Sequence, residues 1–98
     1  MEILKARDGE TLKVNLVGRL DTTTSPELES NLMDDLEDVT ELVLDFEKLD
    51  YVSSAGLRVL LVLQKKMNKQ GSMVIKNASE SIIEVFDITG FIDILTVE

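Results

Sequence analysis

The sequence of 98 residues contains no cysteine and no histidine, and only 4% of its residues are aromatic. Without cysteine, neither a disulfide framework nor a thiolate metal site can form. Because histidine is absent as well, neither a Ser-His triad nor a Cys-His pair is available for nucleophilic catalysis. With so few aromatic residues, the core must consist mainly of leucine, isoleucine and valine.

Motifs for cofactors and metals are also missing. The sequence contains neither Gly-x-Gly-x-x-Gly nor the phosphate loop Gly-x4-Gly-Lys-Ser/Thr. A zinc site would have to use carboxylates alone, which zinc rarely does. The 19 acidic residues could supply an acid–base pair, but abundance by itself is a weak sign of one. We therefore expect no enzymatic activity, no cofactor and no metal.

The net charge of −9 disfavours two classes of partner. Nucleic-acid binding and attraction to anionic membranes both depend on an excess of lysine and arginine. No apolar run approaches the roughly 20 residues of a membrane helix. The start, Met1 to Lys5, lacks the basic and apolar regions of a signal peptide. We expect a cytoplasmic protein whose acidic surface keeps it soluble or meets a partner with a basic patch.

The length and composition fit one domain over residues 1–98. Apolar residues make up 44% and charged residues 30%, as in ordinary globular proteins. A chain of this size buries roughly 65% of its extended surface, which is enough for one core. No repeat, low-complexity tract or linker divides the chain.

The first half of the chain predicts a hairpin and then a helix. Ile3, Leu4 and Ala6, closed by Asp8-Gly9, pair with an alternating strand over residues 12–20. Ser25 is predicted as the N-cap of a helix with Pro26 at its first position. Its apolar stripe repeats every four residues at Leu28, Leu32 and Leu36.

The second half predicts a βαβ unit over residues 41–76, followed by a helix and a strand. Leu42-Val43-Leu44 is typical of a strand covered on both faces. A polar turn then leads to Ser53-Ser54 and a helix over 55–68, with Gly71 as its left-handed C′ residue. The remaining predicted elements are a strand at 73–75, a helix over 79–89 stopped by Gly90, and a strand over 92–97. The fold class is α/β, with a mixed sheet and helices over at least one face.

The two serines at the start of the central helix have two compatible interpretations. A hydroxyl there can cap the helix by accepting a bond from an N–H two or three residues on. An exposed hydroxyl there can instead be phosphorylated, because a phosphate is tolerated beside the unpaired N–H groups of a helix start. Ser53 can serve the first role while Ser54 serves the second.

The stretch Val-Ser-Ser-Ala-Gly-Leu-Arg-Val-Leu-Leu, residues 52–61, resembles the signature of STAS domains, in particular bacterial anti-anti-sigma factors. Weaker matches agree in order and spacing along nearly the whole chain: Gly18-Arg19-Leu20-Asp21, Pro26-Glu27-Leu28, Leu44-Asp45-Phe46, Asn77-Ala78-Ser79 and Phe86 to Phe91. In some well-known members aspartate precedes the acceptor serine, where this chain has Ser53.

The resemblance implies a STAS-like sheet of four or five mixed strands with helices packed mainly on one face. It implies an anti-sigma factor antagonist that sequesters a serine-kinase anti-sigma factor while Ser54 is unphosphorylated. The resemblance further implies that the kinase phosphorylates Ser54 and so breaks the complex, and that a metal-dependent PP2C-type phosphatase removes the phosphate. A monomer or a weak dimer is expected.

The same resemblance implies a partner-binding surface near the acceptor, formed by Asp21, Thr22, Ser53, Ser54, Gly56, Leu57 and Arg58. Asp21 can equally be a turn residue whose side chain bonds local backbone. Two other functions stay open. One is a STAS accessory subunit of a transporter or signalling assembly that is not phosphorylated, and the other is a nucleotide-binding STAS module.

Overall fold

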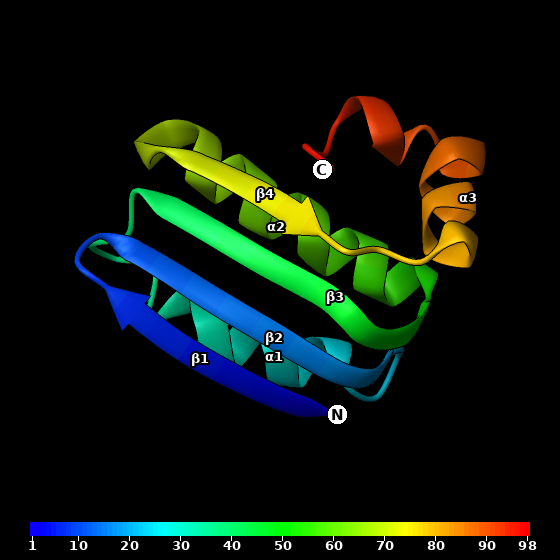
Figure 1. Cartoon of the computed structure of the whole chain (residues 1–98), viewed down its shortest axis with the longest axis horizontal. Coiled ribbons are helices and arrows are strands. Elements are labelled where there is room, and N and C mark those ends of the chain that lie inside the picture. The colour runs from blue at the N-terminus through cyan, green and yellow to red at the C-terminus, as the bar shows by residue number, and fades with distance from the viewer.

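The computed structural model describes residues 1–98 and contains one four-stranded sheet (Figure 1). Its strands lie in chain order: β1 (Glu2–Asp8), β2 (Thr11–Leu20), β3 (Glu41–Val52) and β4 (Ser72–Lys76). β1 and β2 are antiparallel and joined by a tight turn, where Gly9 adopts a left-handed φ of 62°. β3 is parallel to β2 and to β4. The predicted hairpin and the mixed sheet are confirmed.

The helices cover mainly one face of this sheet, as expected. α1 (Ser25–Met33) and α2 (Ser54–Gln70) lie next to each other behind the sheet in Figure 1. α3 (Glu80–Thr89) lies beyond the end of β4, at the end of the sheet where α2 begins (Figure 1). None of the helices combines the length and the apolar composition that crossing a lipid bilayer demands.

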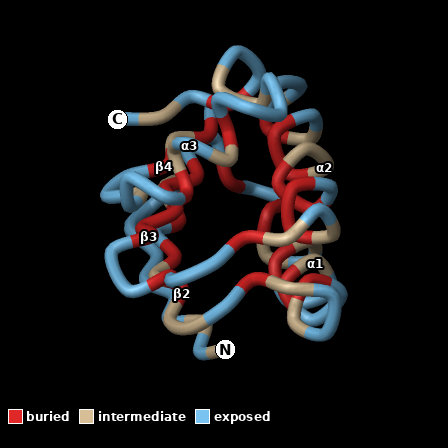
Figure 2. The backbone as a smooth tube through the Cα atoms, turned by 90° about the vertical axis from the view of Figure 1, so that its right-hand side faces the viewer, coloured by how far each residue is buried: buried red, intermediate tan, exposed pale blue.

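The core lies between the sheet and the α1–α2 layer, where the buried residues gather in Figure 2. Its 23 buried residues include only two aromatics, Phe46 and Phe86, so branched aliphatic side chains dominate as predicted. The stripe of Leu28, Leu32 and Leu36 is completely buried, although Leu36 lies in the turn after α1 ends. Each fully buried leucine contributes about 1.5–3 kcal/mol.

The central strand is longer than the sequence indicated. Residues 42–46 are buried, as expected for a strand covered on both faces. The polar turn predicted after them is wrong, because β3 continues to Val52 and stays paired with β2. The pairing contains register shifts between Asn15 and Val17 and between Gly18 and Arg19. These irregularities let the strand bend while Leu49 and Val52 still enter the core.

The predicted final strand over residues 92–97 is also wrong. After Gly90, which ends α3 at a left-handed φ of 81°, the chain forms a short 3-10 helix, Phe91–Asp93. Only Val97 pairs with the sheet, through an isolated parallel bridge to Ile75. Phe91 and Ile92 pack against the core and Leu95 is buried in it, a spacing that suits a helical turn better than a strand.

Two helix ends differ from their predicted chemistry. Ser25 does not cap α1: it is buried inside the helix, and its hydroxyl donates to the Asp21 carbonyl oxygen at 2.5 Å. Gly71 is extended, with φ 171°, rather than left-handed. It is required for a different reason, because a Cβ at this position would collide with the carbonyl group of Thr40.

We expect Gly71→Ala to lower the free energy of unfolding by about 1–3 kcal/mol, the usual cost of forcing atoms into a packed site. The Thr40 carbonyl could not retreat freely, since it accepts the Ser72 N–H at 2.9 Å. Urea denaturation measures the loss. Lys69→Ala, an exposed change near the same helix end, is the control and should stay within about 0.5 kcal/mol of the parent. Equal stability of the two variants would contradict the close approach.

Candidate functional site

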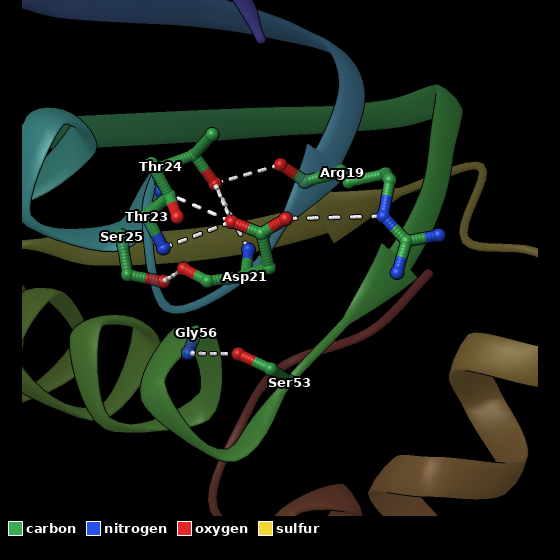
Figure 3. A network of polar contacts seen from close by, with 7 residues as sticks. All are labelled: Arg19, Asp21, Thr23, Thr24, Ser25, Ser53 and Gly56. Carbon is green, nitrogen blue, oxygen red and sulfur yellow. Dashed lines mark hydrogen bonds and ion pairs between the residues drawn. The ribbon is translucent and has the colours of Figure 1, made fainter.

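At the start of α2, two adjacent serines have different surroundings. Ser53 is the N-cap residue: its hydroxyl oxygen accepts the Gly56 N–H at 3.2 Å (Figure 3). Its own N–H donates to the Leu20 carbonyl at 2.8 Å, which ties the start of α2 to the end of β2. The cap predicted for Ser53 is confirmed.

Ser54 is the first residue of α2, and it is exposed. Its hydroxyl has no hydrogen-bond partner within the chain, in contrast to that of Ser53. It lies at the positive end of a 17-residue helix, where the first N–H groups have no partner inside the helix. The Ser54 oxygen is therefore accessible to another macromolecule, in surroundings that favour added negative charge.

Gly56 and Leu57 of the predicted partner surface are both buried. A Cβ on Gly56 would lie 2.8 Å from Cγ of Leu20, so only glycine lets α2 approach the end of β2 this closely. Leu57 is 6% exposed and belongs to the core. These two residues position the first turn of α2 and offer almost no surface themselves.

Asp21 is half-buried in the turn between β2 and α1, where its side chain bonds local backbone. One carboxylate oxygen accepts the N–H groups of Thr23 and Thr24 at 3.0 and 3.1 Å, and it lies 3.3 Å from the Thr24 hydroxyl (Figure 3). The bond from the Thr24 backbone is the main cause that lowers the pKa of Asp21; Arg19, whose Nε lies 3.8 Å from the other oxygen, adds to it. Asp21 thus has the turn role, which the sequence offered as an alternative to partner binding.

The Asp21 turn and the start of α2 lie next to each other, because Leu20 bonds Ser53 and contacts Gly56. Thr22 is exposed in this turn. Arg58 is exposed one helical turn after Ser54, and its guanidinium lies 3.4 Å from the Glu29 carboxylate on α1. The exposed members of the predicted set are therefore Thr22, Ser54 and Arg58, with Asp21 and Ser53 half-buried behind them.

One contact near this site was not predicted from the sequence. The guanidinium of Arg19 lies 4.3 Å from the centre of the Tyr51 ring, a cation–π arrangement between two residues paired across β2 and β3. Tyr51 is 41% exposed. The two residues are 32 positions apart in the chain, and only the pairing register of β2 with β3 brings them together. Periodicity within one strand does not provide that register.

The surroundings of Ser54 suit a macromolecular partner better than a small substrate. None of the three cavities of the molecule is lined by residues of the Asp21 turn or the first turn of α2. Small-molecule sites are normally concave and enclosed. Acidic side chains do not gather anywhere in groups of three that could hold a metal ion.

Comparison with known proteins yields a consistent group of relatives. The family model described as STAS domain matches residues 2–98. The anti-sigma-B factor antagonist of Bacillus subtilis is 34% identical over 87 residues, which cover 88% of this chain and 80% of the relative. BtrV of Bordetella bronchiseptica, a protein assigned as an anti-sigma factor antagonist, is 37% identical over 84 residues, covering 84% and 72%.

Solved structures share the fold. The Bacillus protein SpoIIAA superimposes with a TM-score of 0.77 in both its unphosphorylated and its phosphorylated form. The identities are 19% and 20%, and the matches cover 99% of this chain and 87% and 91% of those chains. At this identity the likeness establishes the architecture.

The division between the two serines predicts unequal effects on stability. Ser53→Ala removes the cap of α2 and should lower the free energy of unfolding by about 1 kcal/mol. Ser54→Ala removes an exposed hydroxyl without a partner and should change it by less than about 0.5 kcal/mol. Urea denaturation of both variants tests this, and an equal loss for the two would contradict the assignment.

The bonds to Asp21 predict a pH-dependent contribution to stability. Because they lower the pKa in the folded state, Asp21 stabilises the fold above the unfolded value of about 3.9 and loses this effect as pH falls through the folded value. Asp21→Asn should therefore unfold at lower urea than the parent near neutral pH, and the difference should shrink in acid. Exposed Asp50→Asn is the control for the loss of a carboxylate and should stay within about 0.5 kcal/mol of the parent near neutral pH. A constant gap for Asp21→Asn would exclude the effect.

Proposed function

Because the chain belongs to the STAS domain family, we propose that it is an anti-sigma factor antagonist. In this proposal it binds and sequesters a serine-kinase anti-sigma factor while Ser54 is unphosphorylated, and so frees a sigma factor. The family match along the whole chain and the names of two relatives, each covered over more than two thirds of its length, support the coarse function. The geometry around Ser54 supports the finer mechanism.

The single observation that carries the proposal is the exposed, unbonded hydroxyl of Ser54 at the start of α2. A kinase can reach this oxygen without unfolding the domain. The phosphate it adds would lie against helix N–H groups and the positive end of the helix dipole, both of which favour an anion. Since the cap of α2 belongs to Ser53, modification of Ser54 leaves that hydrogen bond intact.

The phosphate acts by weakening the interface between this domain and its docked partner. It adds about −1.5 to −2 charges to a chain that already carries −9. Arg58, the cation of α2 nearest to Ser54 in sequence, already pairs with Glu29 and so does little to neutralise the charge of the phosphate. A like charge or an unpaired phosphate in a protein interface costs several kcal/mol. A loss of about 3 kcal/mol lowers the affinity more than about a hundredfold, which is enough for a switch.

In this mechanism the chain is a binding protein and its partners are the catalysts. The anti-sigma kinase transfers the phosphoryl group from ATP to the Ser54 oxygen, and a PP2C-type phosphatase removes it. SpoIIAA, which shares the fold, has been solved in an unphosphorylated and a phosphorylated form, and this supports such a cycle. The cycle places the protein in the cytoplasm, where ATP is available to the kinase.

The proposal predicts opposite behaviour of two variants. Ser54→Asp imitates the added charge and should bind a cognate anti-sigma kinase about a hundredfold more weakly than the parent, whereas Ser54→Ala should bind at least as tightly and resist phosphorylation. Isothermal titration of each variant with candidate anti-sigma kinases from the same organism measures the affinities. Intact mass after incubation with kinase and ATP reports phosphorylation.

Ser81→Asp is the matched control, because it places the same charge on an exposed serine in the first turn of α3. It should leave the affinity unchanged. Equal affinities of Ser54→Asp and Ser54→Ala would rule out the charge switch. Tight binding without any gain in mass would instead favour an accessory subunit that is not phosphorylated.

A further inference from the structure

The last 22 residues of the chain carry negative charge only and expose an apolar side chain on α3. After Lys76 there is no lysine or arginine, whereas five acidic residues follow: Glu80, Glu84, Asp87, Asp93 and Glu98. On α3, Glu84, Asp87 and Ile88 are spaced three and four apart, so they share one face of the helix. All three are exposed, and Ile88 is 77% exposed, more than any other large hydrophobic residue. This outward face is called the α3 stripe below.

A groove of opposite character lies between α1 and α2. Met33 and Val62 line it with apolar atoms, and Lys65, Lys66 and Lys69 line it with charge; its volume is about 340 Å³. The four ion pairs of the molecule involve Lys5, Arg19, Arg58 and Lys76, so none of the three groove lysines is neutralised. Three of only ten cations in the chain thus gather, unpaired, around an apolar floor. This is called the lysine groove below.

The two surfaces cannot meet within one molecule. The lysine groove lies on the second half of α2, whereas α3 lies at the end of the sheet where α2 begins (Figure 1). Lys66 is 12 residues from Ser54, which is about 18 Å along the helix axis. A second copy of the chain, however, can bring its own α3 to this groove.

We propose that the α3 stripe of one copy docks into the lysine groove of the next copy. Ile88 would lie against Met33 and Val62, while Glu84 and Asp87 face the lysines. The acidic side chains, spaced i, i+3, meet lysines with i, i+3 and i, i+4 spacing, so two helices can align several pairs at once. Each surface has apolar atoms flanked by charged side chains. The charges are negative on the stripe and positive on the groove, so the two surfaces are complementary.

This contact is head-to-tail, because each copy offers a different surface to each neighbour. Such heterologous contacts produce an open chain of copies unless the rotation closes a ring. One helix face buries little area, so the contact belongs to the weak, transient class. It does not depend on the function proposed for Ser54, since neither surface contains that residue.

The head-to-tail geometry allows a complementation test with the full chain. Ile88→Asp removes the α3 stripe and leaves the groove intact, whereas Lys65→Glu/Lys69→Glu destroys the groove and leaves the stripe intact. In sedimentation equilibrium up to about 1 mM, the parent should show a mass that rises with concentration, and each variant alone should stay monomeric. An equimolar mixture should form dimers of about twice 10.9 kDa and nothing larger, because one good half-site remains on each variant.

Matched controls place the same chemical changes elsewhere. Leu4→Asp puts a charge on another exposed apolar residue, in β1, and Lys13→Glu/Lys48→Glu reverses two exposed lysines outside the groove. Both should associate like the parent. Circular dichroism and urea denaturation of every variant establish that it is folded, as expected from the exposure of all the changed residues.

Three results would overturn the proposal. A parent that remains monomeric at about 1 mM shows that the surfaces do not bind each other. Folded variants that associate like the parent show that association uses another surface. A mixture of the two variants that stays monomeric excludes the pairing of stripe with groove, even if the parent self-associates. None of these results bears on partner binding through Ser54, which the kinase titration measures separately.

Discussion

The geometry of the candidate functional surface depends on one contact, the close packing of α2 against the end of β2. Leu20 packs directly against Gly56, which has no side chain to prevent this approach. The Ser53 N–H donates to the Leu20 carbonyl beside it. Since strand and helix are held at two points, the direction of the first turn of α2 is set by the core. Ser54 therefore projects outward from a rigid framework and not from a mobile loop.

This arrangement separates a hydroxyl that stabilises the fold from an exposed hydroxyl that is free to be modified, within two adjacent residues. The Ser53 hydroxyl satisfies a helix N–H, and the Ser54 hydroxyl has no hydrogen-bond partner in the chain. On the neighbouring turn, Asp21 likewise satisfies backbone donors while Thr22 is exposed beside it. A modification at the exposed position can change how the surface meets a partner and leave the hydrogen bonds of the fold in place. That separation suits the proposed binding switch, because a small domain has little stability to lose.

Charge is distributed unevenly over the molecule. The chain has an overall charge of −9, yet three of its ten cations gather without an ion-pair partner beside Met33 and Val62, and its C-terminal 22 residues contain no cation at all. Arg19 and Arg58, the cations nearest in sequence to the site, are both engaged, one with Tyr51 and Asp21 and the other with Glu29. A partner that approaches the start of α2 thus meets a different surface from one that approaches its other end.

The sequence by itself determined the elements whose signals are local. The Asp8-Gly9 hairpin, the cap at Ser53, the α3 boundaries at Ser79 and Gly90, and the leucine stripe of α1 all follow from turn chemistry or periodicity within a few residues. Only the tertiary structure decided that β3 extends to Val52, that residues 91–93 form a 3-10 helix, that Gly71 is required by Thr40, and that Arg19 stacks on Tyr51. Each of these depends on atoms contributed by a segment that is distant in sequence. Local propensity cannot supply them, because strand pairing and close packing are determined by the partner that the chain meets when it folds.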